Sequence, residues 1–216
     1  MVVSLNSGTP YTNDSWAIYA NWVWYTANNG NNRRGVGNGF FGCINGNECT
    51  NVRIYNNTLA NMTGPITKPR DGNPTQVSGN IGINYLNGAT GSATVENNLW
   101  YNNAMHINFA PAGTWTEDYN TSLNPRGASS LAGAHDTTVT SGASDPFQSG
   151  AGGDYHLTNE SATGLAGGLT LPSPYNTDPD GVARGVDGTW ERGAYEFGSG
   201  TAERPNPPVV HLVSVK

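Results

Sequence analysis

One short segment, Thr67-Lys68-Pro69-Arg70-Asp71, brings a lysine and an arginine together beside an aspartate. Elimination of a uronate polymer requires a base for the C5 proton and a cation or metal that neutralises the neighbouring carboxylate. Lys68 is the candidate base here, and Arg70 or Arg53 is the candidate cation. The alternative is an ordinary solvated loop, because Pro65 and Pro69 turn the chain here.

Carboxyl groups offer a second kind of chemistry, since glycosidic hydrolysis uses a pair of them on either side of the scissile bond. The available residues are Glu96, Glu117 and Asp118. Glu117 and Asp118 are adjacent and therefore point to opposite faces of a strand, which argues against a working pair. The four histidines are scattered and do not have the spacing of a zinc site. The sequence thus contains no strong catalytic motif.

Aromatic residues favour a different activity, because sugar rings present C–H faces that stack on exposed aromatic rings. Side chains alternate along a strand, so two indoles of the Trp-Val-Trp segment share one face. Some of these rings are equally expected in the core. The candidates for a sugar-binding platform are Trp22, Trp24, Tyr25, Trp100, Tyr101 and Trp115.

Two further groups are candidates for a metal site and a covalent bond. Asp178 and Asp180, in a loop with a glycine, offer oxygen ligands for calcium, although the completing glutamate of an EF-hand is missing. We expect no other cofactor. Cys43 and Cys49 flank an Asn/Gly turn, which favours a disulfide and an oxidising compartment. Two reduced thiols are the alternative.

Composition limits the fold that must position these residues. The net charge is −6 and only 12% of residues are charged, so we expect neither nucleic acid nor an anionic membrane as a partner. The 28 asparagines and 29 glycines exclude a helical bundle, because both types disfavour helix. Six tryptophans and ten tyrosines are too many for a disordered chain. An all-β, turn-rich domain remains.

A weak internal repeat refines this prediction. Short β-prone runs surround an asparagine at Asn21, Asn57, Asn80, Asn98 and Asn120. A repeat of about twenty residues, with a longer first interval that holds an insertion over about 28–50, is typical of a parallel β-helix. Stacked asparagines at the bends would hydrogen-bond from rung to rung as a ladder. The alternative is that asparagine marks ordinary hairpin turns in a β-sandwich.

Several segments resemble pectate-lyase-like β-helix proteins. The runs Ile54-Tyr55-Asn56-Asn57-Thr58-Leu59 and Val95-Glu96-Asn97-Asn98-Leu99 are similar to their rungs. The segments Asp154-Tyr155-His156-Leu157-Thr158 and Gly193-Ala194-Tyr195-Glu196-Phe197 resemble their C-terminal closing region. The resemblance covers roughly residues 17–198 and implies a right-handed parallel β-helix of a secreted bacterial type. It does not fix the function, because this scaffold carries lyases, hydrolases, epimerases, binding modules and adhesins.

Together these features predict a β-helix domain at 1–198 and a Pro-rich linker with a tail strand at 199–216. We expect a secreted, non-catalytic module that binds a plant cell-wall polysaccharide, with a xylan-like neutral glycan as the guess. A covalently linked catalytic domain is the expected partner in a longer protein. The alternatives are a polysaccharide lyase that uses Lys68 and Arg70 on pectate or alginate, and an adhesin or surface-structural β-helix.

Overall fold

The computed structural model describes residues 4–5, 16–24, 39–43, 52–61, 81–85, 92–103, 105–108, 114–125, 131–158 and 164–198. Within these ranges the chain is built from strands, turns and one short 3-10 helix, η1 (Gly150–Gly152). The tail at 199–216 lies outside the described residues. Within the described ranges, no helix is long and apolar enough to cross a membrane.

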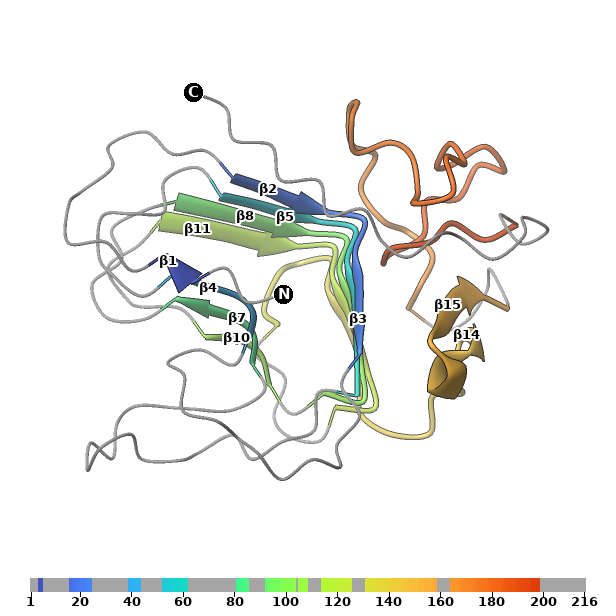
Figure 1. Cartoon of the computed structure of the whole chain (residues 1–216), viewed down its shortest axis with the longest axis horizontal. Helices are drawn as coiled ribbons and strands as arrows, with labels where there is room; N and C mark the ends of the chain where they lie inside the picture. Colours follow the sequence, from blue (N-terminus) through green and yellow to red (C-terminus); the bar gives the residue numbers. More distant parts are fainter. Residues whose placement is uncertain are drawn as a thin grey trace.

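Three parallel sheets make up the first two thirds of the chain (Figure 1). The first sheet consists, in order, of β1 (Ser4–Leu5), β4 (Gly39–Cys43), β7 (Ile81–Tyr85) and β10 (Met105–Asn108). The second consists of β2 (Trp16–Tyr19), β5 (Val52–Tyr55), β8 (Ser92–Glu96) and β11 (Thr114–Asp118). The third consists of β3 (Trp22–Trp24), β6 (Thr58–Ala60), β9 (Leu99–Tyr101), β12 (Thr121–Leu123) and β13 (Thr137–Val139).

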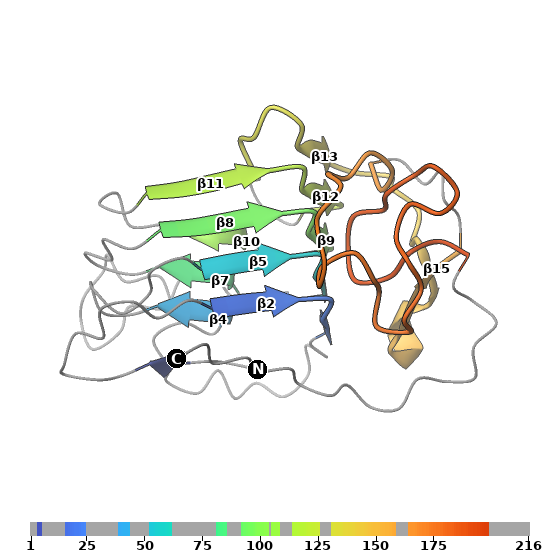
Figure 2. The ribbon, with the colours of Figure 1, turned by 90° about the horizontal axis from the view of Figure 1, so that it is seen from above.

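The strands of the second and third sheets are joined by one repeated sharp bend. Figure 2 shows β2, β5, β8 and β11 stacked beside one another, each leading into its successor in the third sheet. The residue at each bend has a positive φ, between 53° and 58°, which asparagine tolerates better than most residues. These residues are Ala20, Asn56, Asn97 and Tyr119. The left-handed residue is therefore the one before each repeated asparagine.

The repeated asparagines themselves form a ladder of side-chain amides. Nδ2 of Asn21 donates to Oδ1 of Asn57 at 3.0 Å, and Nδ2 of Asn57 donates to Oδ1 of Asn98 at 2.9 Å. Nδ2 of Asn98 in turn donates to Oδ1 of Asn120 at 3.0 Å. Because each amide both donates and accepts, the polar groups of three fully buried asparagines are satisfied inside the core. The predicted ladder is confirmed for these four residues.

The prediction that Asn80 belongs to this ladder is wrong. Asn57 bonds directly to Asn98, and β5 pairs directly with β8, so no rung lies between them. Asn80 itself lies outside the described residues, and the run that follows it forms β7 in the first sheet. Ladder neighbours are consequently separated by 36, 41 and 22 residues, and the expected interval of about twenty holds only for the last.

The insertion expected over about 28–50 is also interrupted by regular structure. Gly39–Cys43 forms β4, which pairs in parallel with β7. The remainder of that range lies outside the described residues. A strand rich in glycine and phenylalanine carries no asparagine at the spacing of the ladder, which is why the repeat did not identify it.

A closing region at 144–198 packs against the outer face of the third sheet. It contains the antiparallel pair β14 (Phe147–Ser149) and β15 (Asp154–Leu157), and most of the rest is turns. Its apolar side chains share a core with the sheet. This core consists of Ala60, Leu99, Leu123, Phe147, Tyr155, Leu157, Leu165, Ala194 and Tyr195.

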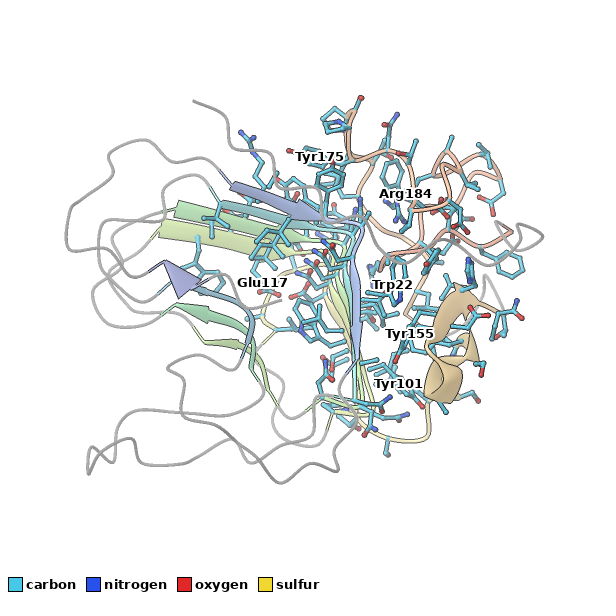
Figure 3. The ribbon with its side chains drawn as sticks, in the orientation of Figure 1. Trp22, Tyr101, Glu117, Tyr155, Tyr175 and Arg184 are labelled. Carbon is cyan, nitrogen blue, oxygen red and sulfur yellow. The ribbon has the colours of Figure 1, made fainter. Side chains whose placement is uncertain are left out.

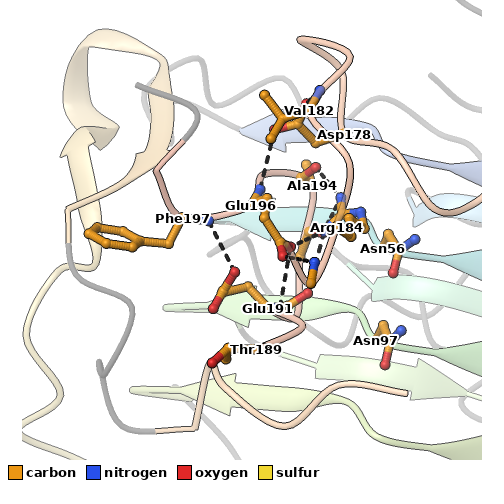
Figure 4. A network of polar contacts seen from close by, with 12 residues as sticks. Asn56, Asn97, Asp178, Val182, Arg184, Thr189, Glu191, Ala194, Glu196 and Phe197 are labelled. Atoms are coloured by element: carbon orange, nitrogen blue, oxygen red, sulfur yellow. Dashed lines mark hydrogen bonds and ion pairs between the residues drawn. The ribbon is translucent and has the colours of Figure 1, made fainter. Parts of the chain in front are cut away.

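A buried cation organises the closing region (Figure 4). The Arg184 guanidinium donates to the backbone oxygens of Gly193 and Ala194 and pairs with Glu196. Glu196 also accepts from the backbone N–H of Gly185, while Glu191 accepts from that of Phe197. Because the side chains of Arg184, Glu191 and Glu196 are buried, each of these hydrogen bonds replaces one that water would otherwise supply.

Candidate functional site

The outer face of the second sheet carries a row of small and polar side chains. In register across the strands lie Ala17, Arg53, Thr94 and Thr116, which we call the outer polar row. Arg53 and Thr116 are exposed, and Thr94 is half-buried. The next residues along the strands, such as Ile54 and Val95, are fully buried because side chains alternate between the two faces.

Three tyrosines stand beside the outer polar row and form a tyrosine cluster. Tyr19 and Tyr55 are neighbours on β2 and β5, two residues after Ala17 and Arg53. Tyr175, from the closing region, packs edge-on against both, with ring centroids 5.0 Å from Tyr19 and 4.9 Å from Tyr55. Figure 3 shows Tyr175 over the end of β2. Tyr55 is buried, so the half-buried rings of Tyr19 and Tyr175 are the aromatic groups that border the polar strip, an arrangement suited to a sugar chain.

Two carboxylates continue the same face at the other end of the tyrosine row. Glu96 and Asp118 are register partners on β8 and β11. Burial and the charge of Asp118 raise the pKa of Glu96. Burial alone would raise the pKa of Asp118, but hydrogen bonds from the ring and backbone of His135 and from the Tyr119 backbone outweigh it and lower the pKa. The face thus carries negative charge next to the cation Arg53.

Glu117 points the opposite way, into the space enclosed by the sheets (Figure 3), and is only 7% exposed. Burial, together with a hydrogen bond and charge repulsion from Asp136, raises its pKa to about 8. The sequence argument that Glu117 and Asp118 face apart is confirmed. Asp118 instead pairs with His135 at 2.8 Å, and the ring of His135 stacks on Tyr119 at a centroid distance of 4.4 Å.

The aromatic platform was expected on the third sheet. In the described residues, the closing region covers that face, so a ligand cannot reach it. Trp24, Ala60 and Tyr101 do share one row, as predicted from their offsets. The closing region covers that face, however: Tyr101 packs against Phe147, and Trp22 packs against Tyr195. Their rings supply the apolar surface on which the closing region docks.

Trp100 is the clearest correction to the platform. It lies between Leu59 and Ser122 on the inner row of the third sheet and is 0% exposed, so it is a core residue. Trp115 is 40% exposed, because β11 is the last strand of its sheet among the described residues. Tyr25 and the side chain of Trp24 lie outside the described residues.

The remaining candidates have structural partners or lie beyond the described ranges. Asp178 accepts from the backbone N–H groups of Asp180, Val182 and Glu196, and Asp180 pairs with His156 at 2.7 Å. Both aspartates therefore hold the closing region together. No set of three or more potential metal ligands occurs in the described part of the chain.

Lys68, Arg70, Cys49 and the side chain of Cys43 fall outside the described residues. The lyase pair Lys68–Arg70 and the predicted disulfide therefore stay predictions.

A sequence signal for the outer polar row was present but overlooked. Each of its members lies four residues before a ladder asparagine, as Arg53 precedes Asn57 and Thr94 precedes Asn98. Tyr175 had no such signal, because its position depends on how the closing region folds back. Compared with known proteins, the chain matched no family model, no curated protein and no solved structure.

Proposed function

We propose that the chain is a secreted, right-handed parallel β-helix, similar to the pectate-lyase-like proteins, that binds a neutral polysaccharide without cleaving it. Support for this fold comes from three parallel sheets that take their strands in the same chain order. Parallel strands in one sheet are connected with a right-handed crossover in nearly all proteins, which supports the hand. The amide ladder supports a coil in which each bend lies over the previous one.

The outer polar row beside the tyrosine cluster is the observation that carries the binding proposal. Arg53, Thr94 and Thr116 present donors and acceptors at the ~4.8 Å spacing of adjacent strands. A polysaccharide lying across the strands meets these groups in succession while its ring faces contact Tyr19 and Tyr175. The hydroxyl groups of a neutral glycan suit such a surface.

Charge favours a neutral ligand over a polyuronate. Glu96 and Asp118 lie on the same face as Arg53, and the whole chain has a net charge of −6. A polymer with a carboxylate on every sugar would be repelled by these groups. One observation supports the alternative of a lyase: the side chain of Arg53, the candidate cation for neutralising a uronate carboxylate, is exposed.

Affinity electrophoresis in gels that contain xylan, other neutral β-glycans or polygalacturonate tests the proposal. We expect retardation by a neutral glycan and about a fivefold loss of affinity in Tyr175→Ala, because an aromatic contact contributes about 1 kcal/mol. Tyr175→Phe retains the ring and should bind like the wild type. Thr116→Val removes one exposed hydroxyl and should weaken binding, whereas Val186→Ala alters a 72% exposed residue of the closing region and should not.

Two results would overturn the proposal. The first is the absence of retardation by any glycan, which would favour the adhesin alternative. The second is formation of unsaturated uronate from pectate or alginate, seen as new ultraviolet absorbance, that is lost in Lys68→Ala or Arg53→Gln. That result would identify a lyase.

A further inference from the structure

The ring of His135 is exposed but is held in place by three contacts. Its side chain is 55% exposed, and Nδ1 lies 2.8 Å from Oδ2 of Asp118. The ring stacks on that of Tyr119, with centroids 4.4 Å apart and ring planes 10° from parallel. The backbone N–H of His135 donates to Oδ1 of Asp118 at 2.7 Å, so its main chain and side chain are fixed to the same carboxylate. A ring that is already ordered loses little conformational entropy when a ligand stacks on it.

The segment that carries His135 is itself anchored to the last strand of the second sheet. A side chain at Gly133 would come within 2.6 Å of a backbone oxygen of β11, so the two chains pass close to each other there. Asp136 accepts the N–H of Gly133 at 2.8 Å with Oδ2 and that of Asn120 at 2.7 Å with Oδ1. Nη2 of Arg192, from the closing region, donates to the His135 backbone oxygen at 3.0 Å. The ring is thus presented by a backbone that is fixed on two sides, as a preorganised binding site requires.

His135 stands at the opposite edge of the second sheet from Tyr19. Tyr19 on β2 and Asp118 on β11 belong to one register line, and Tyr55 and Glu96 are the two positions between them. Figure 2 shows β2 and β11 at the two edges of this sheet. Three strand intervals separate them, which is about 14 Å at ~4.8 Å for each interval. Aromatic rings therefore border both ends of the outer polar row.

The groups between the two aromatic ends suit the hydroxyl groups of a neutral sugar chain. The hydroxyls of Thr94 and Thr116 donate and accept hydrogen bonds, and the exposed guanidinium of Arg53 donates them. The carboxyl group of Glu96, which is half-buried, adds an acceptor. A ligand that contacts both aromatic ends has to cover all four strands, so it must be longer than a disaccharide.

We propose that His135 and Tyr119 form a second aromatic subsite for the polysaccharide, and that the ligand is a stretch of several sugars lying across all four strands of the second sheet. The inference rests on the proposed function, whose site it extends from Tyr19 and Tyr175 to the opposite edge of the sheet. One sugar stacks on the ring of His135, and Asp118 is a positioning residue that holds this ring.

Isothermal titration calorimetry with oligosaccharides of increasing length tests the subsite. The probes are xylo-oligosaccharides from the disaccharide to the hexasaccharide, or the same series of another neutral β-glycan where that polymer retards the wild type in the gel. Wild-type affinity should rise with length until the ligand reaches both aromatic ends. His135→Ala should bind the hexasaccharide about fivefold more weakly, because one aromatic contact is lost, and should bind the disaccharide almost as the wild type does.

Three further variants control for the ring, the location and the fold. His135→Phe retains a ring that can stack on Tyr119 and should restore most of the affinity for the hexasaccharide. Asp187→Ala removes an exposed side chain of the closing region that also bonds to nearby backbone, and should leave binding unchanged. Far-UV circular dichroism establishes that each variant is folded. If His135→Ala does not fold, His135→Gln, whose amide can still donate to Asp118, is measured in its place with the same criterion.

Three results would overturn the subsite while leaving the proposed function intact. The first is wild-type affinity of His135→Ala for the hexasaccharide. The second is an equal loss for every ligand length, because the substitution would then disturb the fold and not a contact with a distant sugar. The third is a loss in His135→Phe as large as that in His135→Ala, which would assign the effect to the bond with Asp118 and not to the ring. If no neutral glycan retards the wild type, the proposed function itself fails and the subsite fails with it.

Discussion

Asn98 lies inside the amide ladder, and Asn21 lies at one end. Replacing Asn98 with leucine should therefore destabilise the protein more than the same change at Asn21. Asn98 is fully buried, and its Nδ2 donates to Asn120, to the Ile54 carbonyl and to the Glu96 carbonyl at 2.9–3.0 Å. Its Oδ1 accepts both the backbone N–H and the Nδ2 of Asn57. Leucine has a similar shape and removes all five hydrogen bonds, leaving their buried partners unsatisfied.

The magnitude follows from these contacts. At about 1 kcal/mol for each hydrogen bond, with further cost for unsatisfied groups and some gain from leucine burial, the loss is about 4–6 kcal/mol. Asn21 is only half-buried, and its Nδ2 donates to Asn57 and to the Tyr19 carbonyl, so Asn21→Leu should cost about 1–2 kcal/mol. Total stabilities of about 5–15 kcal/mol make the Asn98 effect close to unfolding.

Urea denaturation followed by tryptophan fluorescence measures the difference. With a slope of about 2–3 kcal/mol per molar, the midpoint should fall by about 2 M for Asn98→Leu and by less than about 1 M for Asn21→Leu. Asn176→Leu, at an exposed position of the closing region, is the matched control and should change the midpoint little. Equal losses for Asn98 and Asn21 would refute the idea that the amides act as one buried ladder.

Two further substitutions test the bend and the closing region. Ala20→Asn places asparagine at a bend where φ is +53°, as at Asn56, and should raise the free energy of unfolding by about 0.5–1 kcal/mol, measured as a higher urea midpoint. A lower midpoint would contradict the backbone argument. At His156, burial would lower the pKa, but the hydrogen bonds and charges of Asp154 and Asp180 outweigh burial and raise the pKa above 6.5. The stability that the protonated imidazole contributes is therefore complete below pH 6.5 and is lost as the pH rises through the folded-state pKa. The melting temperature of His156→Gln should thus lie well below that of the wild type at pH 5.5 and approach it at pH 9; a constant difference would contradict this linkage.

The amide ladder could be predicted from the sequence because asparagine between two β-prone runs satisfies two requirements at once. The bend needs a residue that accepts positive φ, and the buried position after it needs a side chain that both donates and accepts. Asn56 and Asn57 supply these separately, and the same is true of Asn97 and Asn98. Asn80 precedes a similar run but leads into β7, and only the pairing of strands reveals the difference.

The site was harder to predict because strand periodicity shows which residues share a face but not what covers that face. The offsets placed Trp24 and Tyr101 in one row correctly. Whether this row meets solvent depends on the closing region, whose Phe147 contacts Tyr101 through a fold-back that no local pattern specifies. Similarly, Tyr175 reaches Tyr19 from a segment more than 150 residues later.

The difference between the two outer faces explains why the closing region covers one and leaves the other available. The outer rows of the third sheet carry Leu99, Tyr101 and Leu123, whose burial by the closing region removes a large apolar surface from water. The outer polar row of the second sheet has an arginine and two threonines instead, and covering it would require each polar group to find a new partner. The same energetics that fix the closing region on the third sheet therefore leave the outer polar row uncovered, which is what the proposed binding of a hydrated ligand, able to supply those partners, requires.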